Sequence, residues 1–289
     1  MKPQVGLSMF SVMTELMEDY MGTLENVAKA GYKYIEYIIP RSTDDKTLPS
    51  PEEIGAKVKE LGMTAISSHC NFTAEDDLEK IADDHVKMGA GAIVLPMTVM
   101  STMEEVKAVA DLCNRMGKAC KDRGMGFFYH NHCQEFLKID GKYALLWLAE
   151  LTDPELVSFE VDTFWATRGG VCPVELLETL GSRCKLIHQK DMGESANPVN
   201  LMADAGEITS ENYREKIFGR TNPTDIVTVG TGTMDIQSIV NKVTELGHAP
   251  YIIVELDCIA RSTETNYTTP LSPLESIRVS RENLEKLIG

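Results

Sequence analysis

Eight short apolar runs recur along the 289-residue chain at intervals of about thirty residues, and they limit the folds open to it. Each run is bounded by glycine, proline or a polar turn and is too short for a buried helix, which is typical of strands buried on both faces. The runs begin at Val5, Tyr34, Thr64, Ala92, Gly126, Val157, Lys185 and Tyr251. They predict eight parallel strands.

Helical patterns separate these runs. A helix predicted over residues 50–62 has Ser50 as its cap and Pro51 in its first turn. Another, predicted over residues 23–31, has Thr23 as its cap. Alternating strands and helices predict a parallel sheet covered by helices, and eight units favour closure into an α/β protein with a (β/α)8 barrel. A doubly wound open sheet is the alternative, but no GxGxxG motif follows the first strand.

The whole chain, residues 1–289, is expected to form one such domain, since these barrels commonly have about 250 residues. One connection is much longer than the others. Between the seventh and eighth strands, residues 193–228 are rich in Asn, Gly, Pro and Thr and precede the expected helix. Insertions after a barrel strand lie on the face that carries active sites. We therefore expect a lid or a subunit contact there, with disorder as the alternative.

Charge and composition exclude some classes of function. The formal net charge of −16 argues against nucleic acid as a partner, because phosphate backbones bind through clusters of Lys and Arg. The first residues are too polar for a signal peptide, and no apolar stretch approaches the ~20 residues of a membrane helix. Seven scattered cysteines without a CxxC pair indicate reduced thiols, so we expect a cytoplasmic protein without a membrane partner.

Histidines and carboxylates gather where the predicted strands end, which is where such barrels carry their active sites. The ionisable groups at these strand ends are Glu36, His69, His130, His132, Glu135, Glu160, Asp162, His188, Lys190, Asp191, Glu255 and Asp257. So many buried charges need a shared cation or an extensive hydrogen-bond network. A mixed set of carboxylates and imidazoles suits Mn²⁺, Zn²⁺, Co²⁺, Fe²⁺ or Mg²⁺.

The two-residue period of a strand sorts these groups. His130 and His132 share one face of their strand, and Glu160 and Asp162 share one face of theirs. Pairs that face the barrel interior are the functional interpretation. The alternative for Glu160 is a hydrogen bond to a neighbouring histidine deeper in the barrel.

These strand ends resemble the xylose isomerase-like TIM barrel superfamily of sugar phosphate isomerases and epimerases, which also includes inosose isomerases and dehydratases. The likeness covers nearly the whole chain. It rests on YHNHxxEF (129–136), FEVDTFW (159–165), HxKD (188–191), VGTGTMD (229–235) and VELD (254–257), in that order. VGTGTMD is also a weak candidate for a phosphate-binding loop.

The resemblance implies one divalent metal held by groups after strands five to eight. Asp162, His188 and Glu255 match three of the superfamily's ligands. Where many relatives have a glutamate after strand five, this sequence has His130, which we take as the fourth ligand. The other candidates for that position are Glu160, His132 and a water. Mn²⁺ is the expected ion, with Zn²⁺, Co²⁺, Fe²⁺ or Mg²⁺ as alternatives.

The resemblance further implies an isomerase or epimerase of a sugar or keto-sugar, in which a base removes an α-proton and the metal stabilises an enediolate. Similar YHNHxxEF barrels include lyases that act on 3-keto-glycosides by β-elimination, such as C-glycoside deglycosidases, so a lyase is the alternative. The expected catalytic residues are His132, Glu255 and Glu160. The expected substrate contacts are His69, Glu135, Trp165 and Lys190. Trp165 would stack on a sugar ring or, alternatively, pack under a loop.

Two other classes of function compete with this interpretation. The same barrel carries a zinc endonuclease with three metals, but the net charge and the number of ligands argue against it. A non-catalytic sugar-binding subunit is the other. The expected partners are a small sugar or keto-sugar and either a second copy of the chain or a small second subunit.

Overall fold

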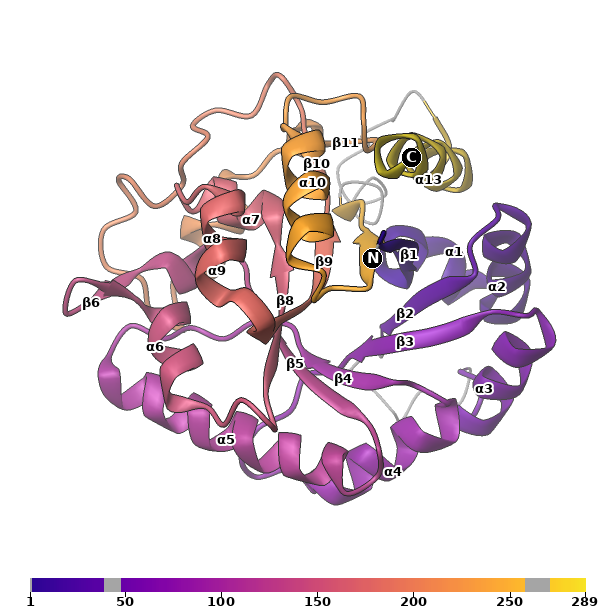
Figure 1. The fold of residues 1–289 in the computed structure, drawn as a ribbon, viewed down its shortest axis with the longest axis horizontal. Helices are drawn as coiled ribbons and strands as arrows, with labels where there is room; N and C mark the ends of the chain where they lie inside the picture. The colour runs from indigo at the N-terminus through magenta and orange to yellow at the C-terminus, as the bar shows by residue number, and fades with distance from the viewer. Residues whose placement is uncertain (1, 39–47, 258–270) are drawn as a thin grey trace.

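The computed structural model describes residues 2–38, 48–257 and 271–289. Within them, eight parallel strands close into a barrel, and helices surround it (Figure 1). In spatial order the strands are β1 (Gln4–Ser8), β12 (Tyr251–Val254), β9 (Cys184–Gln189), β8 (Ser158–Asp162), β5 (Gly126–His130), β4 (Ala92–Leu95), β3 (Thr64–His69) and β2 (Tyr34–Ile38). Each corresponds to one predicted run, so the α/β barrel is confirmed.

The first and the fifth runs continue past their strands. The first leaves the sheet after Ser8 and forms a 3₁₀ turn over Met9–Val12. The fifth ends at His130, so His132 lies in the following loop. At these points the chain turns out of the barrel towards its next helix, and side chains placed there line the carboxyl end of the barrel.

The helices carry the capping signals that the sequence predicts, with one correction. They are α1 (Met13–Glu18), α2 (Tyr20–Lys29), α3 (Pro51–Glu60), α4 (Leu78–Met88), α5 (Met103–Lys121), α6 (Ala144–Leu151), α7 (Thr163–Arg168), α8 (Pro173–Leu180), α9 (Tyr213–Lys216), α10 (Ile236–Leu246) and α13 (Pro273–Ile288). Ser50 caps α3 in a capping box with Glu53. The prediction of Thr23 as a cap is wrong: Asp19 accepts a hydrogen bond from Gly22 N at 3.0 Å, and α2 begins one turn earlier.

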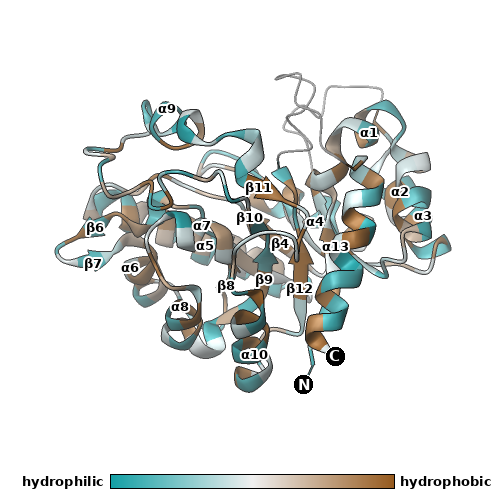
Figure 2. Cartoon of the chain, turned by 90° about the horizontal axis from the view of Figure 1, so that it is seen from above, coloured by the Kyte–Doolittle hydropathy of each residue, from teal (hydrophilic) through white to brown (hydrophobic). Residues whose placement is uncertain are grey.

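The predicted insertion is closed at its base by a small sheet. β10 (Asp191–Met192) pairs antiparallel with β11 (Ile226–Val227), and α9 lies in the excursion between them. Figure 2 shows α9 on the side of the molecule opposite the two chain termini. Because β1 starts near the N-terminus, that side is the carboxyl end of the barrel.

The insertion packs onto the barrel. Arg168 of α7 donates to Pro198 O at 2.9 Å and pairs with Asp225 at 3.1 Å, and neither side chain of this ion pair is exposed. Three apolar side chains of the insertion are also buried, namely Leu201, Ile208 and Ile217. The segment therefore has a small core of its own, continuous with that of the barrel.

The described cysteines are all free thiols. Cys113, Cys120, Cys133 and Cys184 are buried, whereas Cys172 is exposed. Cys258 lies outside the described residues. No helix in the described ranges combines the length and apolar character needed to cross a bilayer.

Candidate active site

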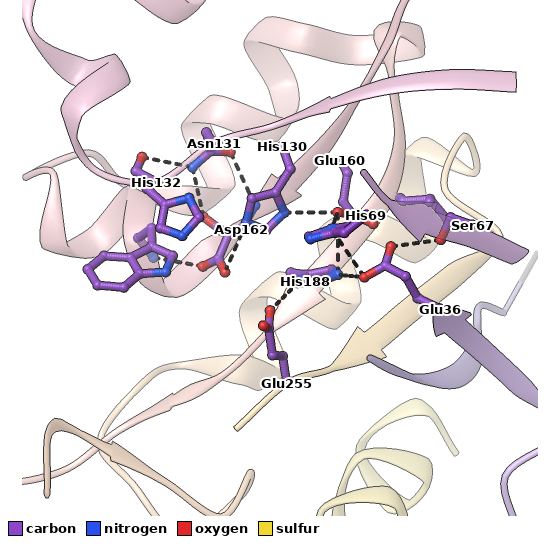
Figure 3. Close-up of polar contacts among 12 residues, drawn as sticks. Glu36, Ser67, His69, His130, Asn131, His132, Glu160, Asp162, His188 and Glu255 are labelled. Atoms are coloured by element: carbon purple, nitrogen blue, oxygen red, sulfur yellow. Dashed lines mark hydrogen bonds and ion pairs between the residues drawn. The ribbon is translucent and has the colours of Figure 1, made fainter. Parts of the chain in front are cut away.

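Imidazoles and carboxylates from five strands meet on the barrel axis (Figure 3). They are Glu36 of β2, His69 of β3, His130 of β5, Glu160 of β8 and His188 of β9. We call these five residues the axial cluster. His69 is 7% exposed and each of the others is at most 1% exposed, so the cluster opens towards solvent only at His69.

Glu160 lies at the centre of the axial cluster. Its Oε2 is 2.8 Å from His69 Nε2 and 2.8 Å from His130 Nδ1. The same oxygen is 3.3 Å from His188 Nε2. From the other side, Glu36 Oε1 lies 2.8 Å from His188 Nε2 and 3.2 Å from His69 Nε2. Glu160 thus makes the hydrogen bonds expected of the structural alternative, yet its Oε1 has no hydrogen-bond partner within the described residues.

Charge in the axial cluster is shared between carboxylates and imidazoles. Burial by itself would raise the pKa of Glu160, but His188, His130 and His69 hold it well below its usual value. Burial would likewise lower the pKa of His188, but Glu160 and Glu36 raise it well above its usual value. Burial dominates at His130 and lowers its pKa to about 3. A cation is therefore required beside these carboxylates, either a proton on an imidazole or a metal ion.

A second group of ligands shares His188. Its Nδ1 lies 2.6 Å from Glu255 Oε2, and Asp162, His188 and Glu255 offer ligand atoms within 4.8 Å of one another. The Lys190 ammonium lies in the same place. Its Nζ is 3.1 Å from Asp162 Oδ2, 2.5 Å from Glu255 Oε2 and 3.0 Å from Asp257 Oδ1. We call Asp162, Lys190, Glu255 and Asp257 the lysine–carboxylate cluster.

Two of the predicted site residues, one metal ligand and one substrate contact, belong to different groups. His130, the expected fourth ligand, directs Nδ1 into the axial cluster, and its Nε2 is 3.9 Å from Asp162 Oδ2. Lys190, an expected substrate contact, is 1% exposed and is surrounded by three carboxylates. Its contacts are those of a cation that neutralises the site.

His132 lies beside the axial cluster, with its ring 5.0 Å from that of His130. The residue is half-buried, and its Nδ1, which is shielded from solvent, has no hydrogen-bond partner in the described part of the chain. The ring centroids of Trp165 and His132 are 5.1 Å apart, and the ring of Phe218 in the insertion contacts both of these rings. Because Trp165 is fully buried, it lies under the insertion, as in the alternative to stacking on a sugar ring.

The YHNHxxEF motif holds its own turn in place. Asn131 accepts from Asp162 N at 3.2 Å and donates to Asp162 O at 3.3 Å, which ties the ends of β5 and β8 together. Glu135, an expected substrate contact, accepts from Tyr129 Oη at 2.8 Å and from His132 N at 2.9 Å. Burial raises the pKa of Glu135 to about 7. These contacts position the turn that carries His132.

Glu36 and Ser67 belong to the site, although no role was predicted for them from the sequence. Glu36 is a lone carboxylate in an otherwise apolar run, and its neighbour Tyr37 faces outward and donates to Met88 O of α4. Alternation along the strand therefore places Glu36 inside the barrel. Ser67, which donates to Glu36 Oε2 at 2.7 Å, carries no comparable signal in the sequence.

The glycine-rich VGTGTMD turn encloses a carboxylate of its own chain. Asp191 accepts from the backbone N–H groups of Gly230, Gly232, Met192 and Met234 at 2.8–3.2 Å. Convergent backbone N–H groups of this kind are what a phosphate would need. Since Asp191 already occupies them, the turn serves to fix the start of α10.

Comparisons with known proteins agree with this architecture. Residues 24–283 match the family model described as xylose isomerase-like TIM barrel. An inosose dehydratase of Geobacillus kaustophilus is 32% identical over 158 residues, which are 54% of this chain and 47% of that protein. The chain thus spans about half the length of the curated relatives it matches.

Two solved structures show the same fold. A sugar phosphate isomerase/epimerase of Parabacteroides distasonis superposes with a TM-score of 0.77 at 22% identity, covering 100% of this chain and 96% of the other. An IolI protein with a bound zinc atom superposes with a TM-score of 0.66 at 16% identity, covering 99% and 98%. With the family model matched over most of its length, the chain belongs to the xylose isomerase-like TIM barrel family.

Proposed function

We propose that this protein is a metal-dependent lyase that acts on a keto-sugar or an inosose by β-elimination. The reaction begins with removal of the proton next to the ketone, a step that it shares with the isomerase or epimerase expected from the sequence. We choose the lyase over the epimerase because the two candidate bases, His132 and Glu255, have different surroundings. His132 has an unpartnered ring nitrogen, whereas Glu255 is held by two cationic groups.

His132 is suited to be the single base. The residue is half-buried beside the axial cluster, its unpartnered Nδ1 is shielded from solvent, and the Glu135 carboxylate accepts a hydrogen bond from its backbone N–H. Burial, followed by the influence of His130 and Lys190, lowers its pKa well below the usual value. The neutral imidazole that a base requires is therefore its resting form at neutral pH.

Glu255 is not placed as an opposing base. Epimerisation by two bases needs a second free group on the other face of the carbon. The Glu255 Oε2 accepts from Lys190 and lies beside His188, and these neighbours hold its pKa well below the usual value although burial opposes them. Because Glu255 Oε2 is already engaged by Lys190 and His188, this oxygen orients its neighbours and is not free to take a proton from a substrate.

A single residue can both remove the proton and return it to the leaving group. His132 takes the α-proton, and the electron pair of that C–H bond forms an enediolate. The pair then returns to form the carbon–carbon double bond as the β-hydroxyl leaves with the proton from His132, which yields water and an unsaturated ketone. A divalent metal, when bound, supplies positive charge next to the enediolate oxygen. Its candidate ligands are the axial cluster and the set Asp162, His188 and Glu255.

The comparisons support this proposal at the level of chemistry. The curated relatives are called inosose dehydratases, which matches an elimination, although the chain spans about half of their length. A solved neighbour called L-ribulose 3-epimerase keeps isomerisation as the second candidate. Zinc in the IolI structure favours Zn²⁺ alongside the Mn²⁺ expected from the sequence.

The full chain, loaded with Mn²⁺ or Zn²⁺, is offered inososes and 3-keto-glucosides in D₂O. We expect an unsaturated ketone, and we expect His132→Gln to lower turnover by about 10²–10⁴-fold with its metal content unchanged. The exposed His248→Gln serves as a matched control and should behave as the parent chain. A deuterated isomer without elimination would establish the isomerase instead, and no exchange with any ketone would sink both.

We also propose that residues 193–228 cover the substrate. Phe218 contacts His132 and Trp165, so the insertion already borders the candidate base. Protease should cleave the insertion more slowly when substrate is present. Equal cleavage rates, together with a dimer or a complex with a small second subunit in solution, would indicate a subunit contact instead.

A further inference from the structure

We propose that the metal of this protein binds in the axial cluster, at His69, His130, His188 and Glu160, and that the Lys190 ammonium replaces a metal at Asp162 and Glu255. This placement rests on the metal dependence proposed above and differs from the ligand set that the sequence motifs imply. The placement in the axial cluster names the side chains that bind the cation, so it can be tested without knowing the substrate.

The spacing of the axial ligands fits one small cation. His69, His130, Glu160 and His188 each offer one ligand atom, and these atoms lie within 4.8 Å of one another. The three nitrogens lie 2.8, 2.8 and 3.3 Å from the same Glu160 oxygen. A tetrahedral ion with bonds of about 2.0–2.1 Å would hold its ligand atoms about 3.3 Å apart. Small outward shifts of the side chains would therefore admit the ion.

The surroundings of these imidazoles resemble an outer shell of ligand partners. Metal-binding histidines usually direct their second nitrogen at a carboxylate or carbonyl. His188 directs Nε2 into the axial cluster while its Nδ1 lies 2.6 Å from Glu255 Oε2. His130 directs Nδ1 into the cluster, and its Nε2 faces Asp162 Oδ2 at 3.9 Å. Glu255 is thus placed to orient one axial ligand through a hydrogen bond, whereas Asp162 lies beside another without bonding to it.

Charge favours the same position. Glu36 and Glu160 are fully buried, and Glu160 Oε1 has no hydrogen-bond partner among the described residues. Buried carboxylates need a cation close by. The only side chains within hydrogen-bond distance of Glu36 in the described structure are histidines and Ser67, so the axial cluster has no Lys or Arg of its own. A divalent ion would supply the missing charge.

The lysine–carboxylate cluster, in contrast, already holds its cation. Lys190 Nζ lies within 3.1 Å of Asp162, Glu255 and Asp257. Asp162 has also committed Oδ1 to Trp165 N at 2.8 Å, where it caps α7. A divalent ion between Asp162 and Glu255 would compete with the ammonium for the same oxygens and would be repelled by it. Binding there requires Lys190 to leave.

The test is cobalt binding by the full chain, because Co²⁺ absorbs visible light in a manner that depends on its ligands. Metal-free protein is titrated with Co²⁺ and the bound metal is counted by elemental analysis. His69 belongs only to the axial cluster, so His69→Gln should weaken Co²⁺ binding at least about 100-fold, beyond what loss of an outer-shell partner costs. Asp162→Asn should weaken it by about tenfold and keep the visible spectrum of the parent.

Two further variants distinguish the loss of a metal ligand from a failure of the chain to fold. Glu36→Gln keeps the shape and the Ser67 contact but removes a charge, so it should fold and still weaken Co²⁺ binding about tenfold or more. His85→Gln removes a buried histidine of α4 outside the site and should bind as the parent does. Full metal binding by both His69→Gln and Glu36→Gln would overturn the placement, as would loss of the metal in Asp162→Asn alone.

The outcome separates this placement from the function on which it rests. A parent chain that binds Co²⁺ through His69 but exchanges no proton with any ketone supports the site and refutes the lyase. A parent chain that converts a ketone to the unsaturated product while His69→Gln keeps its metal supports the lyase and refutes the site. A parent chain without stoichiometric metal refutes both.

Discussion

Replacing Arg168 should reveal how strongly the insertion is attached to the barrel. In Arg168→Met, the Asp225 carboxylate remains fully buried and retains the Asn222 N–H at 3.1 Å, while its Oδ1 already has no hydrogen-bond partner within the described residues. Removing one partner of a buried ion pair costs about 3–5 kcal/mol. One kcal/mol lowers Tm by about 2–4 °C in chains of about 150–250 residues and by less in larger ones, so this 289-residue chain should melt roughly 5–15 °C lower.

The assay is urea unfolding followed by circular dichroism, with proteolysis of the insertion as a local readout. Arg183→Met is the matched control. Arg183 is half-buried and donates only to neutral oxygens, Thr152 Oγ1 among them, so its loss leaves no buried carboxylate without its cation. It should cost about 1–3 kcal/mol.

A double variant tests the explanation itself. Arg168→Met with Asp225→Leu removes both charges, and replacing a buried pair by apolar groups is often close to neutral. The double variant should therefore be more stable than Arg168→Met alone, and should lie below the parent chain mainly by about 1 kcal/mol for the lost hydrogen bond to Pro198 O. If Arg168→Met costs less than about 1 kcal/mol, or if the double variant is the less stable of the two, the stranded carboxylate is not the cause.

Three other predictions concern different parts of the chain. Because burial raises the pKa of Glu135 to about 7 from its ordinary 4.5, the folded state retains a proton that the unfolded chain loses, so stability should fall by up to roughly 3 kcal/mol between about pH 4.5 and 7. In Glu135→Gln, urea unfolding at pH 5 and pH 8 should show a smaller difference, and an unchanged difference would contradict the assignment. Gly230→Ala should cost about 1–3 kcal/mol more than Gly62→Ala in the same assay, because both have positive φ but only at Gly230 would the added Cβ meet a neighbour within 3 Å; equal costs would exclude the clash. A thiol reagent should label the exposed Cys172 well before the buried Cys113, whose pKa burial raises, and simultaneous labelling would show that the core opens.

The sequence alone determined the barrel and the end of it that carries chemistry. A short run of apolar residues forms a strand that has to be buried on both faces, and eight such runs at regular spacing indicate a closed parallel sheet. This requirement depends only on residues that are close together in the sequence, so it can be predicted from them. The capping box at Ser50 was predictable for the same reason, since its two partners lie three residues apart. Strand alternation likewise indicated that His130 and Glu160 face the interior.

Only the tertiary structure decided which groups meet. Glu36 and His188 are 152 residues apart in the chain, yet their side chains are 2.8 Å apart because the barrel closes. The position of Lys190 among three carboxylates depends on the registers of β8, β9 and β12, which no local pattern specifies. A motif names the residues that can bind a cation, but the distances between their atoms determine which of them hold a metal and which hold an ammonium.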